Sequence, residues 1–125
     1  MRLLLDTHVL IWWARGSEGL SRRATREISS PVNDVFVSAA SVWEAEIKAV
    51  AGKLHLDADL AGEPASEGFS ELDVTATHAV EAARLPLHHT DPFDRMLIAQ
   101  ARLENLTLVT RDAAFAAYEV PLLAA

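Results

Sequence analysis

Residues 2–6 read Arg2-Leu3-Leu4-Leu5-Asp6, an apolar run that ends on an acid. A run this short and apolar predicts a buried strand over residues 2–5. A carboxylate at the end of a buried strand loses hydration, which is unfavourable unless a cation or hydrogen bonds compensate. Asp6 is therefore the first candidate for a functional residue.

Strand and helix patterns alternate along the rest of the chain. We expect further strands at residues 35–37, 69–74, 106–109 and 120–122. We expect helices at residues 7–14, 20–29, 41–50, 56–60, 75–84 and 91–104, and a loop at residues 62–68. In the last of these helices, the expected buried side carries Met96, Leu97, Ala101 and Leu103. The alternation predicts a mainly parallel sheet of four to five strands with right-handed crossovers.

Composition and length favour one α/β domain over residues 1–125. Half of the residues are apolar, which is enough for a core, and the absence of cysteine excludes disulfides and thiolate zinc sites. The apolar run at residues 9–14 is far shorter than the roughly 20 residues of a membrane span. We see no secretory signal, so we expect a cytoplasmic protein without a membrane association. The net charge of −7 alone opposes nucleic-acid binding, unless cations shield a cluster of acids.

Three further acids fall at the same edge of the predicted sheet as Asp6. Glu44 lies at the start of the helix after strand 35–37, Asp94 lies in the first turn of its helix, and Asp112 follows strand 106–109. Ligands of parallel sheets bind outside the carboxyl ends of the strands. Carboxylate oxygens suit Mg²⁺ or Mn²⁺ and disfavour zinc. Such ions activate water and neutralise charge in phosphodiester hydrolysis.

Each acid also has a purely structural explanation. Residues 41–44 fit a capping box, and residues 91–94 fit another helix start. Asp112 could cap the turn that follows it, and Asp6 could cap the first helix. For a single acid, capping is the simpler explanation. The convergence of four acids on one sheet edge favours a metal site, because caps have no reason to converge.

Polar neighbours of the acids are candidates for supporting roles. We assign ligation to Asp94 and expect Asp91 to be the helix cap, while Thr110 could orient a ligand through its hydroxyl. The histidines beside the acids, His8 and the pair His88-His89, match no zinc signature. We therefore expect them at the surface or in supporting positions.

Basic side chains near the acids could contact a substrate phosphate. Lys48 lies one helical turn after Glu44 and could pair with that acid instead. Arg95 directly follows Asp94 and Arg111 directly precedes Asp112, and ordinary surface pairing is their alternative role.

Among the aromatic residues, Trp43 is expected to be packed in the core.

Four runs of the sequence resemble the PIN domain, and they are closest to the VapC-like toxins of bacterial toxin–antitoxin pairs. The runs are Leu3-Leu4-Leu5-Asp6-Thr7-His8, Ser41-Val42-Trp43-Glu44-Ala45-Glu46-Ile47-Lys48, Asp91-Pro92-Phe93-Asp94-Arg95-Met96-Leu97-Ile98-Ala99-Gln100-Ala101 and Leu108-Val109-Thr110-Arg111-Asp112. Each motif is weak alone, but their order and spacing are specific. The resemblance extends from Arg2 to about Phe115.

This resemblance implies a PIN-like three-layer α/β/α sandwich and a Mg²⁺-dependent ribonuclease. Its acidic site would consist of Asp6, Glu44, Asp94 and Asp112 at the matching positions, with Mn²⁺ as a possible replacement for Mg²⁺. The family usually forms a homodimer that a small cognate antitoxin holds inactive. Its substrates are RNAs, often tRNA or rRNA.

Two other functions are compatible with parts of the pattern. A catalytically degenerate PIN-like module could serve only to bind a partner, although all four acids are present. An aspartyl nucleophile would require a second Asp two residues after Asp6, and that position is His8. A covalent phosphoenzyme is therefore disfavoured.

Overall fold

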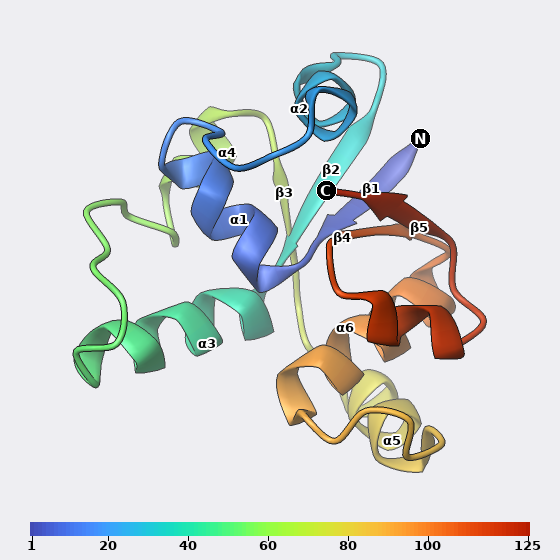
Figure 1. Ribbon diagram of the computed structural model, residues 1–125. Coiled ribbons are helices and arrows are strands. Elements are labelled where there is room, and N and C mark those ends of the chain that lie inside the picture. The colour runs from blue at the N-terminus through green and yellow to red at the C-terminus, as the bar shows by residue number, and fades with distance from the viewer.

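A parallel sheet of five strands lies at the centre of the computed structural model, which describes residues 1–125 (Figure 1). The strand order is β3-β2-β1-β4-β5, and every neighbouring pair is parallel. The strands are β1 (Arg2–Leu5), β2 (Asp34–Ser38), β3 (Ser70–Leu72), β4 (Thr107–Thr110) and β5 (Leu122–Ala124). Strand β1 is central, and the order of the sheet reverses between β1 and β4. Ligands of open parallel sheets bind at such a reversal.

Helices connect these strands. They are α1 (Thr7–Ala14), α2 (Arg22–Ser29), α3 (Ala39–Val50), α4 (Glu63–Ser66), α5 (Ala76–Arg84) and α6 (Pro92–Glu104), with a 3₁₀ helix η1 (Ala113–Ala117). None of them combines the length and the hydropathy that crossing a membrane requires.

Alternating side chains of β1 divide the core into two layers. Leu3 and Leu5 pack on one face of the sheet with residues of α1 and α2. Leu4 packs on the other face with residues of α5, α6 and η1. All three leucines are fully buried, as expected for a central parallel strand covered on both faces. The expected three-layer α/β/α sandwich with a parallel sheet is confirmed, and Figure 1 shows the helices on both sides of the strands.

The helix expected at residues 56–60 is wrong. Leu54, Leu56, Ala58 and Leu60 all pack on the core beside α1, and every second residue of this segment turns inward. A spacing of two is typical of extended chain, whereas a helix needs a spacing near 3.6. A short helix, α4, forms instead within the expected loop at residues 62–68.

Helix α3 begins two residues earlier than expected. Ser38 is its N-cap, and the Ser38 hydroxyl accepts a hydrogen bond from the backbone N–H of Ala40 at 3.1 Å. Ser41 therefore lies inside the helix, and the capping box expected at residues 41–44 does not form. This frees the Glu44 side chain from a structural role at the helix start.

Three side chains differ in burial from the expectation. Leu103 is 40% exposed and Met96 is half-buried, because the buried face of α6 passes through Leu97 and Ala101. Leu103 lies roughly 200° around the helix from Ala101. Trp43, which was expected in the core, is 64% exposed on α3. Strands β3 and β5 are also shifted or shortened relative to residues 69–74 and 120–122.

Candidate metal and catalytic site

Asp6 lies between the end of β1 and the start of α1. Its carboxylate does not cap α1, so the capping alternative fails for this residue. Asp6 is buried, with 4% of its surface exposed, and its Oδ2 accepts a hydrogen bond of 2.7 Å from the Thr110 hydroxyl. Burial raises the pKa of Asp6, although the bond from Thr110 and the nearby His8 act in the opposite direction. The folded chain thus holds an acid where its charge is unfavourable.

Glu44 points inward from α3, where it is almost completely buried. Its Oε2 accepts an ion-paired hydrogen bond of 2.9 Å from Lys48, one turn further along the helix. Its other oxygen, Oε1, is buried without a hydrogen-bond partner. A buried carboxylate oxygen without a partner is costly, so it marks a position where a ligand would be stabilising.

Asp94 lies in the first turn of α6 and interacts with the other acids. Burial raises its pKa to about 7, and repulsion from Asp91, Asp6 and Glu44 acts in the same direction, while His89 lowers it. Asp94 on α6, Glu44 on α3 and Asp6 at the end of β1 therefore form one electrostatic cluster. A group with such a shifted pKa at the end of a parallel sheet is a typical functional-site candidate.

Asp91 is the N-cap of α6, as expected. Its Oδ1 accepts hydrogen bonds from the backbone N–H groups of Phe93 at 2.9 Å and Asp94 at 3.1 Å. The cap holds the first turn of α6 and therefore the backbone from which Asp94 projects.

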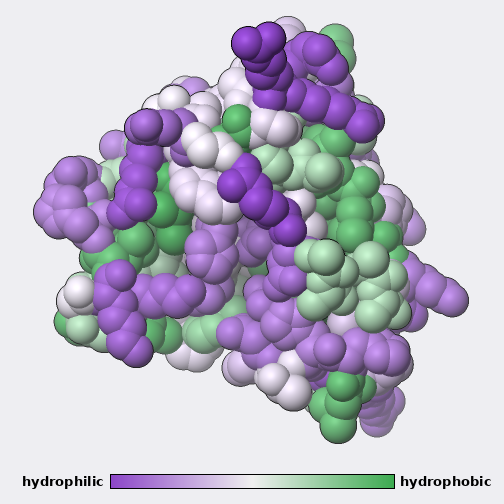
Figure 2. All heavy atoms as spheres, viewed as in Figure 1, coloured by the Kyte–Doolittle hydropathy of each residue, from purple (hydrophilic) through white to green (hydrophobic).

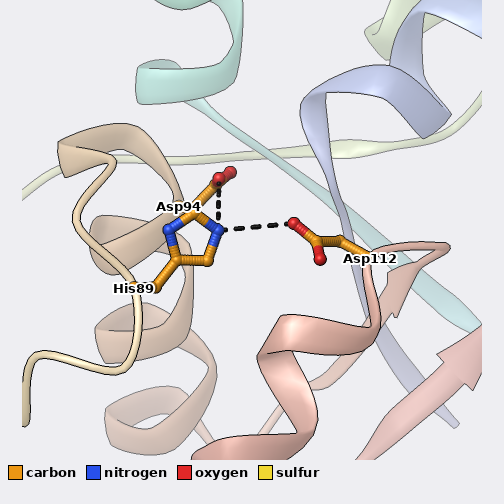
Figure 3. Close-up of side chains that lie close together, drawn as sticks. All are labelled: His89, Asp94 and Asp112. Atoms are coloured by element: carbon orange, nitrogen blue, oxygen red, sulfur yellow. Dashed lines mark hydrogen bonds and ion pairs between the residues drawn. The ribbon is translucent and has the colours of Figure 1, made fainter.

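Asp112 follows β4 and reaches the cluster through a histidine. Its Oδ1 caps η1 by accepting a hydrogen bond from the Ala114 backbone N–H, so the expected capping role is confirmed. The cap uses only one of the two carboxylate oxygens. Its Oδ2 lies 3.3 Å from Nε2 of His89, and the same nitrogen lies 3.0 Å from Oδ2 of Asp94 (Figure 3). One ligand atom from each of these three residues falls within 4.8 Å of the others.

His89 was expected at the surface or in a supporting position, and its place between two acids was missed. One sequence signal could have found it. His89 stands two residues before the cap Asp91, and a residue there lies at the same end of the helix as Asp94. A histidine just before an acidic helix start at the functional edge of the sheet therefore deserves more weight than its distance from a zinc signature indicates.

A cleft opens over this cluster. Its lining residues are Asp6, His8, Trp12, Asp94, Arg111 and Asp112. In Figure 2, hydrophilic side chains cover much of the middle of the molecule, where Figure 1 places the starts of α1 and α3. The Arg111 guanidinium lies over the Trp12 ring at 4.4 Å and also donates to the backbone carbonyls of Gly19 and Ala125.

Arg95 does not line this cleft. Its position therefore contradicts the expected contact with a substrate phosphate. The residue is only 8% exposed. Its guanidinium donates to backbone carbonyls at the end of α5 and in the loop before α6, those of Ala82, Ala83, Leu85, Pro86 and His89. Arg95 is therefore an internal tether for the loop that carries His89.

The acidic cleft thus lies at the carboxyl edge of a parallel α/β sheet, where ligands of such folds bind. The sequence model of the PIN domain matches residues 3–121, and the chain belongs to the PIN domain family. The expected resemblance is thereby confirmed over nearly the whole chain.

The chain is 29% identical to Ribonuclease VapC22 of Mycobacterium tuberculosis over 113 residues, which cover 88% of this chain and 86% of that protein. Its fold is similar to that in VapBC2 from Rickettsia felis bound to a promoter DNA fragment, with a TM-score of 0.70, 16% identity and coverage of 99% and 98%. VapBC-5 of Mycobacterium tuberculosis, a member of the VapBC family of toxin–antitoxin systems, has a TM-score of 0.60, 20% identity and coverage of 98% and 96%. At these identities the two structures establish the fold alone.

Proposed function

We propose that the chain is a Mg²⁺-dependent endoribonuclease, the toxin of a toxin–antitoxin pair, which hydrolyses RNA phosphodiesters in the cytoplasm. One observation carries the proposal: Asp6, Asp94 and Asp112, from three separate segments, line one cleft, and buried Glu44 interacts electrostatically with Asp6 and Asp94. PIN family membership and the similarity to Ribonuclease VapC22 support the same activity.

The acidic cluster fits a divalent cation. Oε1 of Glu44 is buried without a partner, and burial disfavours the ionised forms of Asp6 and Asp94, so a cation would compensate for three unfavourable groups. Carboxylate oxygens suit Mg²⁺ and also accept Mn²⁺. The residues that would hold the ion are Asp6, Glu44, Asp94 and Asp112. When bound, it supplies an activated water and neutralises charge on the phosphodiester.

The other side chains hold these acids in place. Thr110 donates to Asp6 and accepts from the backbone N–H of Asp112 at 3.0 Å, so a single hydroxyl connects two of the acids. Lys48 restrains Glu44 through their ion pair. A chain with a net charge of −7 repels RNA. A bound cation would neutralise part of the charge of the four acids, so that the RNA backbone could approach them. Arg111 adds positive charge to the wall of the cleft.

Two partners follow from the proposed function, a small cognate antitoxin and a second copy of the chain. Toxin–antitoxin assembly is what the VapBC structures represent, and it comes to this chain only by similarity. For the homodimer, the support is an apolar patch on α3 in which Trp43, Ile47 and Val50 are 64%, 44% and 89% exposed. Such a stripe on a helix is typical of an interface.

The test is cleavage of RNA by the purified chain. Total RNA is incubated with Mg²⁺, with Mn²⁺ or with a chelator, and the new RNA ends are mapped. We expect discrete cleavage with either ion and none with the chelator. Glu44→Gln should abolish cleavage, whereas Glu46→Gln, an exposed position on the same helix, should leave it unchanged. Folded protein that cleaves no RNA with either ion would instead support a catalytically degenerate binding module.

A further inference from the structure

His89 connects two acids that come from different elements. Its Nε2 lies 3.0 Å from Oδ2 of Asp94, on α6, and 3.3 Å from Oδ2 of Asp112, after β4 (Figure 3). The His89 side chain is 16% exposed. No other side chain forms a hydrogen bond or an ion pair with both of these carboxylates.

The ring and the backbone of His89 are both held by other elements. The backbone N–H donates to the Tyr118 hydroxyl at 2.9 Å, and the backbone carbonyl accepts from Arg95 at 3.0 Å. The ring packs against Phe115, with the ring centroids 5.6 Å apart. These contacts fix the imidazole at the edge of the cleft before any ligand arrives, as a preorganised site requires.

The second ring nitrogen identifies the tautomer. Nδ1 of His89 accepts a hydrogen bond of 3.3 Å from the backbone N–H of Asp91. A neutral imidazole that accepts at Nδ1 carries its proton on Nε2. Nε2–H therefore donates to Oδ2 of Asp112 at 3.3 Å, and Oδ2 of Asp94 lies 3.0 Å from the same nitrogen. To act as a metal ligand through Nε2, the ring would need its proton on Nδ1, where it would face the N–H of Asp91.

We propose that His89 is a positioning residue of the metal centre: its Nε2–H donates to Asp112 and lies against Asp94, and it sets how these carboxylates present their remaining lone pairs to the cation. This inference rests on the proposed function. Oδ1 of Asp94 has no hydrogen bond in the structure, so the contact with His89 orients the carboxylate and leaves that oxygen for the ion. His89 itself does not ligate the metal.

The partners of metal-binding side chains matter measurably, because losing one typically lowers metal affinity or activity 10–100-fold. The effect is expected to be large here, because Asp94 and Asp112 belong to separate elements that the histidine joins. Without the donor, repulsion between the two carboxylates would favour other side-chain rotamers in the metal-free chain. The cation would then have to bring them back together.

Mn²⁺ binding to the full chain tests this inference without using catalysis. Affinity is measured by calorimetry for the wild type, His89→Leu, His89→Asn and His89→Gln, and for His55→Leu as a control at an exposed histidine. We expect His89→Leu and His89→Asn to weaken binding about 10–100-fold. His89→Gln, whose longer side chain can place an N–H near the position of Nε2, should restore most of the affinity, and His55→Leu should bind like the wild type.

Pulsed electron paramagnetic resonance of Mn²⁺ on the wild type distinguishes positioning from ligation. We expect no coupling between Mn²⁺ and an imidazole nitrogen. Coupling that is present in the wild type and disappears in His89→Gln would overturn the proposal. This measurement does not depend on whether His89→Leu folds. Wild-type affinity in both His89→Leu and His89→Asn would also overturn it, while leaving the proposed function intact if Asp94→Asn abolishes binding. A wild type that takes up no Mn²⁺ would overturn the metal centre and the role of His89 together.

Discussion

At the scale of single residues, the site is destabilising for the chain that carries it. The pKa of Asp94 rises from 3.8 to about 7, and that of Asp6 is also raised, in both cases mainly by burial. A carboxyl with a higher pKa in the folded state binds more protons when folded than when unfolded. The free energy of unfolding therefore decreases as pH rises through that window, here from about 4 to about 7.

This linkage predicts a pH-dependent stability of the metal-free chain. In the presence of a chelator, the melting temperature should be lower at pH 8 than at pH 5, and Asp94→Asn should reduce the difference, because the amide has no charge to bury. Adding Mn²⁺ should raise the melting temperature more at pH 8, where the acids are ionised. Thermal unfolding followed by circular dichroism measures all three effects. The exposed Asp57→Asn is the control, and a pH dependence that is the same in Asp94→Asn and in the wild type would contradict the assignment.

Thr110 should contribute to stability through its hydroxyl alone. Thr110→Val keeps the shape of the side chain but removes the donor to buried Asp6 and the acceptor for the Asp112 backbone N–H. We expect a loss of about 1–3 kcal/mol in the free energy of unfolding, as for a buried polar group left without its partner. Urea denaturation at pH 8 measures the loss. Thr107→Val, on the same strand and without a side-chain hydrogen bond, should change stability much less, and equal losses in the two variants would argue against this role.

At the scale of elements, Arg95 joins the end of α5 to the start of α6. Its guanidinium satisfies backbone carbonyls at the C-terminal end of α5 and in the loop up to His89. Carbonyls at the end of a helix have no partner within it, and a cation there is doubly favourable. The loop that presents His89 therefore depends on a side chain from the next helix.

We expect Arg95→Met to lower the free energy of unfolding by about 3 kcal/mol or more, because buried carbonyls lose a charged donor. Arg102→Met on the same helix should cost at most about 1 kcal/mol, since Arg102 makes only a 3.7 Å surface pair with Glu81. Urea denaturation compares the two variants. Hydrogen exchange should also become faster in residues 85–91 of Arg95→Met, and unchanged exchange there would show that the loop does not depend on this tether.

The sequence predicts elements well where periodicity is strong and poorly where tertiary contacts decide. The run Leu3-Leu4-Leu5 identifies a central strand because no other short element needs to be apolar on both sides. Chain order alone places Asp6 and Asp112 at one edge of the sheet, because the carboxyl ends of parallel strands meet there, whereas Glu44 and Asp94 lie on helices. The segment at residues 56–60 differs from the predicted helix because an alternation of apolar residues this short does not distinguish a helix from an extended chain.

The roles of Arg95 and His89 could not be predicted in the same way. A charged residue beside Asp94 has the same sequence context whether it faces the cleft or turns under the loop. Its direction depends on where the end of α5 lies, and this is a property of the packed helices α5 and α6. Similarly, the distance from His89 to Asp112 spans two separate elements. Local pattern identifies candidate residues, and packing decides which of them meet.

At the scale of the whole molecule, the acidic cluster and the apolar patch both include residues of α3. Glu44 points into the protein and the adjacent Trp43 points outward, where its ring packs edge-on against Phe93 with centroids 5.2 Å apart. An apolar groove lined by Ala39, Ala40, Trp43, Val74, Pro92, Phe93 and Met96 continues the patch. Phe93 in turn precedes Asp94. A subunit docked on this patch would thus contact the same two helices that carry two of the acids.

The patch predicts self-association that a single charge should weaken. Ile47 is 44% exposed on α3, so Ile47→Glu leaves the core of the monomer intact but places a charge in the apolar interface. Sedimentation velocity should show a wild-type dimer and a dissociation constant raised more than about tenfold in Ile47→Glu, since one unpaired buried charge costs more than 1.4 kcal/mol. Val80→Glu, at a similarly exposed position on α5, should remain dimeric like the wild type. A wild type that stays monomeric at the highest concentration measured, or an Ile47→Glu variant that dimerises like the wild type, would contradict the dimer interface. The patch would then be assigned to antitoxin binding instead.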